Sequence, residues 1–488
     1  MKRLVVTCDG TWVDSDNGFI RDSWLPWKRG GHLATPSNVT RICRALLPRT
    51  DDGISQIAYY QAGVGSENNF YSYFLGGFLG SGINENIREA YAFLCDNYED
   101  GDEIFLIGFS RGAFTARSIG GLIRDIGLLT GKGLDSFYPI FKDWENQANP
   151  DYKPLYGTEF WPINRPRFSD PSYVPKLVQD GLTRPNVPIK AIGVWETVGT
   201  LGVPEMEIFG VKLFQTRHKE YSFINQEVPS NLEFAYQALA LDEERKAFAP
   251  TLWESPRPGA SSKLKVLRQC WFPGVHSSVG GDYPDTSIAD LTLAWMITQL
   301  AAHLQFDPQY ILLQNQENVA FYESNHLPVA SWAMGQIPQS DDGFAYTLTG
   351  RQVRTPGDYH ATNPKTGKQL PQKLTDTHEF MHPSVRYRIQ EKGPGLTKGA
   401  STYMSDTTYA PKALKGWKYF APYQPWQDAA KGCETLGDDL GKWDGYGKWM
   451  VRKKSGIVTV IVEEKIEPRT DQMELLDAWP AVKEKVLN

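Results

Sequence analysis

EIFLIGFSRGAFTARSI, residues 103–119, is the stretch of sequence that decides the fold. An apolar run leads into GFSRG (108–112), and apolar residues at helical spacing follow. This order predicts a nucleophile elbow: a strand ends, the chain turns sharply into a helix, and Ser110 lies at the tip. Gly108 and Gly112 suit such a turn, because a Cβ there would collide with the neighbouring strand or helix. The alternative is an ordinary glycine-rich turn, since GxSxG also occurs by chance.

The composition indicates a globular protein. Of its 488 residues, 41% are hydrophobic and 12% aromatic, enough to bury one large core or two moderate ones. The net charge of −6 and the pI near 5.9 give no basic footprint, so we expect no nucleic-acid partner. The five cysteines are scattered and lack CxxC spacing, which predicts reduced thiols. We expect neither a metal nor another cofactor.

The N-terminal residues 1–12, MKRLVVTCDGTW, do not predict a signal peptide. Asp9 interrupts the apolar run far short of a signal-peptide core. Elsewhere no stretch approaches the roughly 18 uninterrupted apolar residues of a transmembrane helix. We therefore expect a cytoplasmic protein with no transmembrane segment. Export without a signal peptide and peripheral contact with a membrane both stay open, and the sequence does not indicate an oligomeric state.

Strands and helices alternate along the first part of the chain. Apolar and β-branched runs predict strands at residues 4–8, 57–60 and 104–107, and helical spacing predicts helices at 38–47 and 83–98. This alternation is typical of a parallel sheet with right-handed crossovers. The predicted fold class is α/β, with a mostly parallel central sheet flanked by helices. The later elements are predicted as strands at 189–197 and 264–272, helices at 137–145, 231–241 and 287–304, and a hairpin of 449–451 with 457–462.

The domain prediction follows from where this alternation lapses. Residues 1–305 form the expected catalytic core, with cap or lid insertions at 132–188 and 204–230. Residues 306–488 form a C-terminal extension packed on the core, which we expect to cover part of the site entrance. The aromatic, glycine-rich tract 70–82 is interpreted as a buried packing loop, with an acyl pocket or membrane contact as the alternative.

A catalytic serine needs a base that takes its proton and an acid that orients the base. Of the eight histidines, His276 alone follows a predicted core strand within a glycine-rich turn. The acid is expected between Ser110 and His276 in the chain. Glu196 meets that condition because it ends a predicted buried strand, while Asp180 and Asp242 are weaker rivals.

The oxyanion formed during such a reaction needs two backbone N–H donors. One is expected from Arg111, directly after the serine. The other is expected from Gly10 or Thr11, in the turn after the first strand. Residues that we expect to line the substrate pocket are Asp9, Trp12 and Trp195.

Residues 378–382 spell HExxH, which on a helix would offer a zinc site. Pro383 would end the helix at the second ligand, and the flanks lack an apolar helical run. We therefore expect a short exposed helical turn and no metal.

Five motifs together resemble a known family. They are CDGTW (8–12), GFSRGAFTAR (108–117), GVWETVGTLG (193–202), LALDEERKAFAPTLW (239–253) and WFPGVHSSVGGDY (271–283). The chain resembles, over roughly residues 1–305, the uncharacterised α/β-hydrolases that include the lipase effectors of bacterial type VI secretion. The resemblance implies an α/β-hydrolase fold and a triad of Ser110, Glu196 and His276. The characterised effectors cleave membrane glycerophospholipid esters.

One departure from the family pattern and one further candidate base bear on the site. The acid position usually carries Asp, and here it is Glu196. His382 lies in a segment that also resembles the family, so it is the reserve candidate for the base. The expected function is a serine hydrolase of carboxylic esters, either lipase or phospholipase or a small-ester hydrolase, that acts through an acyl-enzyme. The alternative is a catalytically inactive binding or scaffold protein with the same fold.

Overall fold

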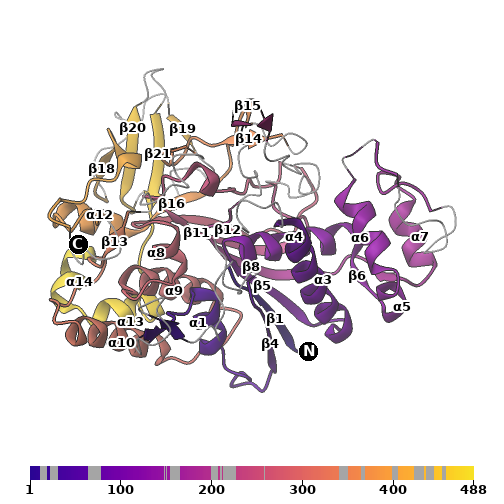
Figure 1. Cartoon of the computed structure of the whole chain (residues 1–488), viewed down its shortest axis with the longest axis horizontal. Helices are drawn as coiled ribbons and strands as arrows, with labels where there is room; N and C mark the ends of the chain where they lie inside the picture. Colours follow the sequence, from indigo (N-terminus) through magenta and orange to yellow (C-terminus); the bar gives the residue numbers. More distant parts are fainter. Residues whose placement is uncertain are drawn as a thin grey trace.

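The structure is a computed structural model. It describes residues 1–10, 19–21, 31–63, 79–147, 149, 151–153, 165–198, 207–208, 211–212, 227–257, 259–339, 350–363, 369–397, 405–422, 433–435, 445–452 and 458–487. An 11-stranded, mostly parallel sheet runs through the molecule (Figure 1). Helices cover it, so the chain has an α/β architecture.

The strand order places β5, which leads into the elbow, inside the sheet as the third strand from the β4 edge. From one side, parallel neighbours follow one another as β4 (Gln56–Gln61), β1 (Arg3–Cys8), β5 (Glu103–Phe109), β8 (Ile189–Trp195), β11 (Leu232–Ala240), β12 (Val266–Phe272), β16 (Glu379–Met381) and β21 (Val458–Glu463). Antiparallel β20 (Lys448–Arg452) and β18 (Lys418–Phe420) continue beyond β21, and β19 (Cys433–Thr435) pairs with β21 in parallel. Because the central strands are parallel, their carboxyl ends meet along one edge, where open α/β sheets bind ligands.

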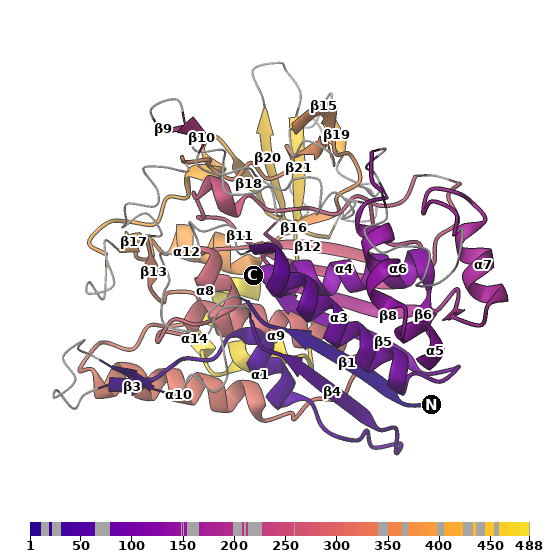
Figure 2. The same ribbon diagram turned by 45° about the vertical axis from the view of Figure 1, so that its right-hand side comes forward.

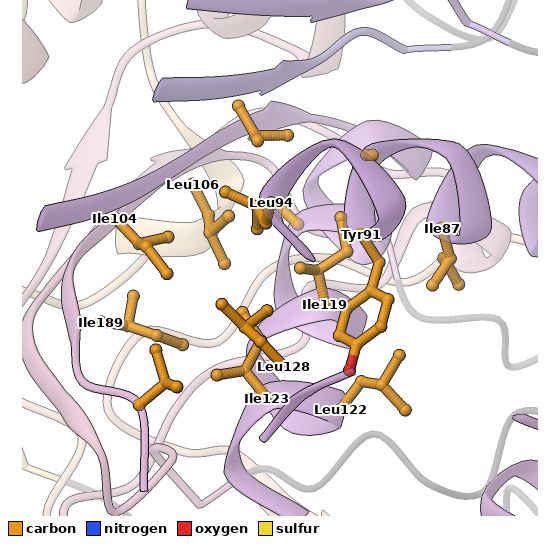
Figure 3. Close-up of a cluster of buried hydrophobic side chains, with 14 of the residues drawn as sticks. Ile87, Tyr91, Leu94, Ile104, Leu106, Ile119, Leu122, Ile123, Leu128 and Ile189 are labelled. Carbon is orange, nitrogen blue, oxygen red and sulfur yellow. The ribbon is translucent and has the colours of Figure 1, made fainter. Parts of the chain in front are cut away.

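Helices pack on both faces of this sheet. Ile104 and Leu106 of β5 join the cluster formed with α3 (Leu79–Asn97) and α4 (Arg111–Ile126), as Figure 3 shows. The intervening Phe105 and Ile107 join the opposite cluster, which includes residues of α1 (Asn38–Ala45) and α9 (Ser287–Leu300). Successive side chains of β5 thus point to opposite faces of the sheet and are buried on both, as expected for a parallel strand inside a sheet.

Two predictions of local structure are wrong. Residues 231–241, expected as a helix, form β11, which pairs with β8 on one side and β12 on the other. The HExxH stretch at 378–382, expected as an exposed helical turn, contains the buried strand β16. In both segments the long-range pairing with neighbouring strands overrides the local pattern.

A helical lobe follows the far end of α4. It contains α5 (Gly131–Leu134), α6 (Phe137–Glu145) and α7 (Tyr173–Gln179), closed by β6 (Leu128–Leu129) and β7 (Thr183–Arg184). Both views show it on the side of the molecule away from β18 and β20 (Figure 1; Figure 2). At 1.5 Å rise per residue, the length of α4 puts the base of the lobe about 24 Å from Ser110. A role as a lid over the site stays a prediction.

Strands from both sides of the predicted boundary at residue 305 belong to one sheet. The strands β16 and β18 to β21 all come from the expected C-terminal extension and hydrogen-bond into the same sheet. The division at residue 305 stays a prediction about folding units. Of the insertion expected at 204–230, the structure describes 227–230 and the hairpin of β9 (Glu207–Ile208) with β10 (Val211–Lys212). Of the tract 70–82, expected as a packing loop, residues 79–82 begin α3 and residues 70–78 lie outside the described residues.

The remaining elements are short or peripheral. They are β2 (Phe19–Arg21), β3 (Gly31–Leu33), η2 (Lys246–Phe248), α8 (His276–Gly280), α10 (Tyr310–Ser324), β13 (Ile337–Pro338), β14 (His360–Thr362), β15 (Gln369–Lys373), α12 (Pro383–Gln390), β17 (Leu396–Thr397), η3 (Lys412–Leu414), α13 (Asp471–Asp477) and α14 (Pro480–Leu487). Within the described part of the chain, no helix combines the length and apolar character needed to cross a membrane. Among the described residues, Cys8, Cys43, Cys95 and Cys270 are free cysteines.

Candidate active site

Ser110 lies on the turn between β5 and α4, at the carboxyl edge of the sheet. Its φ of 57° and ψ of −119° fall outside the regions that non-glycine residues favour. A Cβ at Gly108 would lie 2.4 Å from the carbonyl oxygen of Gly112, and a Cβ at Gly112 would lie 2.0 Å from that of Cys8. The two glycines therefore allow α4 to pack closely on β5 and β1. This packing holds the strained serine at the start of α4, partly exposed.

His276 begins α8, after the turn that follows β12. Its Nε2 lies 2.8 Å from Oγ of Ser110. The rings of Phe109 and Phe248 flank the imidazole, with ring centroids 4.7 Å and 4.8 Å from its own. Burial lowers the pKa of His276, and the hydrogen bond with Glu196 opposes this shift. The imidazole is therefore mostly neutral near pH 7 and able to accept a proton from the serine.

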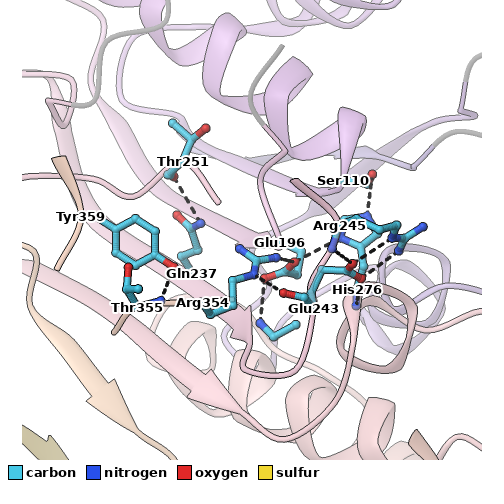
Figure 4. Close-up of polar contacts among 11 residues, drawn as sticks. Ser110, Glu196, Gln237, Glu243, Arg245, Thr251, His276, Arg354, Thr355 and Tyr359 are labelled. Atoms are coloured by element: carbon cyan, nitrogen blue, oxygen red, sulfur yellow. Dashed lines mark hydrogen bonds and ion pairs between the residues drawn. The ribbon is translucent and has the colours of Figure 1, made fainter. Parts of the chain in front are cut away.

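Glu196 follows β8 and brings a carboxylate to the other side of His276. Its φ of 45° turns the chain sharply at the strand end. Oε2 lies 3.2 Å from Nδ1 of His276, and Oε1 accepts the N–H of Ala240 at 2.7 Å. A carboxylate at Nδ1 favours the tautomer with the proton on that nitrogen, which leaves Nε2 as the acceptor facing Ser110. The three side chains thus meet at the ends of β5, β8 and β12 (Figure 4).

Residues 2–299 match the family model described as "T6SS, Phospholipase effector Tle1-like, catalytic domain". This match covers more than half of the 488 residues. The chain belongs to this family. Membership supports a lipase or phospholipase activity, and it agrees with the family resemblance seen in the five sequence motifs.

Two further comparisons give more distant likenesses of this Tle1-like protein. The uncharacterized protein YEL023C of Saccharomyces cerevisiae is 34% identical over 134 residues, which is 24% of this chain and 20% of that protein. The chain therefore matches about a fifth of the length of that relative. A crystal structure of an uncharacterized protein from Pseudomonas aeruginosa superposes with a TM-score of 0.33 at 15% identity, covering 64% of this chain and 47% of that one.

The turn after β1 lies against Ser110 of this Tle1-like protein. A Cβ at Gly10 would lie 3.3 Å from the Cβ of Ser110 and 3.1 Å from Cδ1 of Phe109, so a larger residue would require these neighbours to shift by a few tenths of an ångström. The Gly10 N–H donates to Oδ1 of Asp9 at 2.7 Å. Arg111, the other expected oxyanion donor, is the first residue of α4, and burial lowers the pKa of its guanidinium to about 10. Thr11 lies outside the described residues.

Asp9 is buried and ties the turn after β1 to its surroundings. Its Oδ2 accepts hydrogen bonds from the hydroxyls of Ser37, Thr40 and Tyr60, at 2.7, 3.0 and 2.9 Å. Burial raises the pKa of Asp9 to about 6 in spite of these donors. The carboxylate therefore holds α1 and β4 against the end of β1, close to the serine.

The two tryptophans expected in the pocket have different outcomes. Trp195 is fully buried in the apolar core behind the site, and its carbonyl oxygen accepts the N–H of Ser110 at 3.1 Å. It therefore supports the elbow from within the core. Trp12 lies outside the described residues.

The two rival candidates for the acid, Asp180 and Asp242, contact other residues. The carboxylate of Asp180, at the end of α7, lies 3.5 Å from Nζ of Lys176. Asp242 accepts a hydrogen bond from the hydroxyl of Tyr409 at 2.8 Å, and burial raises its pKa to about 6. Of the three candidates, Glu196 is the one whose carboxylate the structure places at the imidazole of His276.

His382, the reserve base, caps α12. Its Nδ1 lies 2.7 Å from Oγ of Ser384, and its Nε2 lies 3.0 Å from Oε1 of Gln472. Glu379 of the same HExxH stretch accepts the indole N–H of Trp271 at 2.8 Å. Among the described residues, no cluster of three or more His, Cys, Asp or Glu side chains is arranged to hold a metal ion.

Three charged residues near His276 had no role in the sequence prediction. Glu243 accepts the backbone N–H of His276 at 3.2 Å and pairs with Arg245 at 2.9 Å. Burial alone would raise the pKa of Glu243, but the charge of Arg245 brings it down to about 2. Arg354 donates to Glu196, 158 positions away in the chain. The acidic and basic run in residues 239–253 is the one sequence signal that could have pointed to the first two.

Proposed function

We propose that this protein is a serine hydrolase with an α/β-hydrolase fold, which cleaves carboxylic esters of lipids through an acyl-enzyme. One observation carries the proposal. Nε2 of His276 lies 2.8 Å from the hydroxyl of Ser110, while Nδ1 of the same ring lies 3.2 Å from the carboxylate of Glu196. A strained, glycine-flanked serine, an imidazole and a buried carboxylate in this order form the relay that activates a hydroxyl for attack.

In the first half-reaction, Oγ of Ser110 attacks the ester carbonyl carbon while Nε2 of His276 takes the hydroxyl proton. The negative charge of Glu196 stabilises the resulting imidazolium through Nδ1. When the tetrahedral intermediate collapses, the carbon–oxygen bond to the alcohol breaks, and the imidazolium gives its proton to the leaving alcohol. The acyl group then remains on Ser110 as an ester.

Water completes the second half-reaction. His276 takes a proton from the water as it attacks the acyl-enzyme, and it returns the proton to Oγ of Ser110 when the carboxylic acid leaves. The backbone N–H of Arg111, at the positive end of α4, supports the oxyanion in both halves. The turn after β1 is the proposed source of the second donor. Because the N–H of Gly10 already donates to Asp9, Thr11 is the better candidate there.

A fluorophosphonate probe tests the nucleophile, because it labels only an activated serine. We expect labelling of the wild-type protein that disappears in Ser110→Ala. Ser118→Ala is the matched control: Ser118 lies on the same helix, and its hydroxyl donates to the carbonyl oxygen of Phe114 at 2.7 Å. We expect this variant to be labelled like the wild type. A folded wild-type protein that is not labelled would favour the inactive scaffold instead.

The substrate class is tested by comparing three substrates at one enzyme concentration. These are a short-chain p-nitrophenyl ester, a long-chain triglyceride emulsion and phosphatidylcholine–phosphatidylglycerol vesicles. The family description leads us to expect the release of fatty acid from the vesicles. Rapid cleavage of the short ester without any turnover on vesicles would assign a small-ester hydrolase instead.

A further inference from the structure

The acid of the proposed triad is held by a residue from the far part of the chain. Nη2 of Arg354 donates to Oε2 of Glu196 at 2.8 Å, and Nε of Arg354 donates to the backbone oxygen of Glu243 at 3.2 Å. Figure 4 shows the guanidinium reaching Glu196. The side chain of Arg354 is 3% exposed and that of Glu196 is 1% exposed. The two residues form a buried ion pair. Glu196 lies within the family match at residues 2–299, and Arg354 lies beyond it.

The segment that carries Arg354, residues 350–359, is fixed on the core at both ends. Its backbone hydrogen bonds to the core include Lys246 N–H to Gly350 O at 3.2 Å, Gln352 N–H to Glu244 O at 2.9 Å and Gly357 N–H to Glu379 Oε2 at 2.9 Å. The first two bonds join the segment to the loop that also carries Glu243, and the third joins it to β16. Arg354 is therefore positioned before any substrate arrives.

Oε2 of Glu196 serves two donors at once. Arg354 approaches it at 2.8 Å and Nδ1 of His276 at 3.2 Å. A buried carboxylate that loses one partner of such a pair is left with uncompensated charge, which is strongly unfavourable. The guanidinium also lies only two hydrogen-bond lengths from the imidazole. Its positive charge adds to that of Arg245, which lowers the pKa of His276, and it also fixes the carboxylate that orients the ring.

The charged groups around the imidazole come from three parts of the chain. Glu196 follows β8, Glu243 and Arg245 follow β11, and Arg354 lies on the 350–359 segment. His276 itself begins α8. Two carboxylates and two guanidiniums thus surround a neutral ring, so the loss of either cation leaves the surroundings of His276 net negative.

We propose that Arg354 is a positioning residue for the catalytic acid: it orients Glu196 toward His276 and balances its charge. This inference rests on the proposed hydrolase function. It also means that the C-terminal third completes an active site whose reacting residues all lie within the family match at residues 2–299.

The test compares Arg354→Met, Arg354→Lys and a matched control, Arg386→Met. Arg386 forms a second buried pair, with Nε 2.9 Å from Oε1 of Glu463, and it comes from the same third of the chain. The readouts are kcat/KM for a short-chain p-nitrophenyl ester between pH 4 and 9, the rate of fluorophosphonate labelling, and Tm by circular dichroism. Tm separates a loss of folding from a change at the site.

We expect Arg354→Met to lower kcat/KM by about 100-fold, because Glu196 and the ring lose their alignment. We also expect the acidic limb of its pH profile to move upward by about one pH unit, since the imidazolium is no longer opposed by the guanidinium. Arg354→Lys should keep the wild-type limb but recover only part of the rate, because an ammonium lacks the planar fork that reaches both oxygens. Arg386→Met should lower Tm and leave the limb in place.

A folded Arg354→Met variant with wild-type kcat/KM would overturn the inference, and so would a rate loss without a shift of the limb. If that variant does not fold, Arg354→Lys decides: a lower rate with the wild-type limb supports positioning, and a full wild-type rate overturns it. An unlabelled, inactive wild-type protein would instead overturn the proposed hydrolase and this inference with it. A labelled wild type with an unaffected Arg354→Met overturns this inference alone.

Discussion

Two buried histidines lie at the ends of neighbouring strands and have different partners. His276 follows β12 and begins α8, while His382 follows β16 and caps α12. Since β12 and β16 are parallel neighbours, both rings lie along the same edge of the sheet, 4% and 1% exposed. His276 contacts the hydroxyl of Ser110 and the carboxylate of Glu196. His382 contacts the hydroxyl of Ser384 and the side-chain amide of Gln472. Position at a strand end does not separate a candidate base from a structural cap; the partners do.

The largest expected effect is on the rate. His276→Gln should lower kcat by about 10⁴-fold to 10⁶-fold, as the loss of a base does in other serine hydrolases, with little change in Tm. His382→Gln should do the reverse: a lower Tm and a nearly unchanged kcat, because its ring contacts no reacting group. Both are measured by ester hydrolysis and thermal unfolding. An active His276→Gln together with an inactive His382→Gln would make His382 the base.

The second effect concerns two buried carboxylates, one at the candidate active site and one away from it. Glu196→Gln should lower kcat by about 10³-fold to 10⁴-fold, because an amide cannot stabilise the imidazolium. Glu463→Gln, at the end of β21, is the control: it alters a buried carboxylate paired with Arg386 and should affect stability rather than rate. Loss of activity in Asp242→Asn with a fully active Glu196→Gln would transfer the acid role to Asp242.

The third effect is the pH dependence of activity. His276 acts as a base only when neutral, and burial lowers its pKa from the ordinary value of about 6.5. Activity should therefore be complete at pH 7 and fall only as the pH drops through this lowered pKa. The measurement is kcat/KM for a soluble ester against pH. A limb above pH 6.5 would mean that the group controlling the rate is not a buried neutral imidazole.

The fourth effect is the pH dependence of stability, and here His382 contributes. Burial lowers its pKa to about 3 in the folded protein, while the unfolded chain binds the proton near pH 6.5. Below about pH 6.5 the unfolded state gains a proton that the folded state cannot take, so stability falls with falling pH until about pH 3. Urea unfolding at pH 7 and pH 5 should show a smaller decrease for His382→Gln than for the wild type.

The smallest effect concerns the cap of α12. Ser384→Ala removes the hydroxyl 2.7 Å from Nδ1 of His382 and should cost about 1 kcal/mol of unfolding free energy, with unchanged kcat. The corresponding change at the other histidine, Ser110→Ala, should abolish hydrolysis. A loss of activity in a stable Ser384→Ala variant would contradict the assignment of His382 as a structural residue.

Local chemistry made the elbow predictable. The two glycines around Ser110, the apolar strand before it and the helical spacing after it all act within one short stretch, and β5 and α4 form there. By contrast, residues 231–241 place apolar side chains at helical spacing, yet they form β11. This strand lies between β8 and β12 and is buried on both faces. Its sequence therefore lacks the alternation of polar and apolar residues that marks a half-exposed strand.

The charged surroundings of the site were less predictable. Glu196 and His276 could be chosen because each follows a predicted strand whose end reaches the same edge. Arg354 lies in an irregular segment without periodicity, and its partner is 158 positions away, so no pattern in the sequence joins them. The same holds for Glu243, which approaches His276 through a backbone N–H that any residue could supply.

The continuation of the sheet past the family match affects any shorter version of the protein. Gln269 to Trp271 of β12 pair with residues 379–381 of β16. In a fragment that stops near residue 299, the backbone groups of β12 that face β16 would be unpaired, while the pairing with β11 would remain, and Trp271, now fully buried, would lose its cover on that side. Bare strands of this kind recruit other chains. We expect the matched region by itself to self-associate and precipitate, even though it contains Ser110, Glu196 and His276.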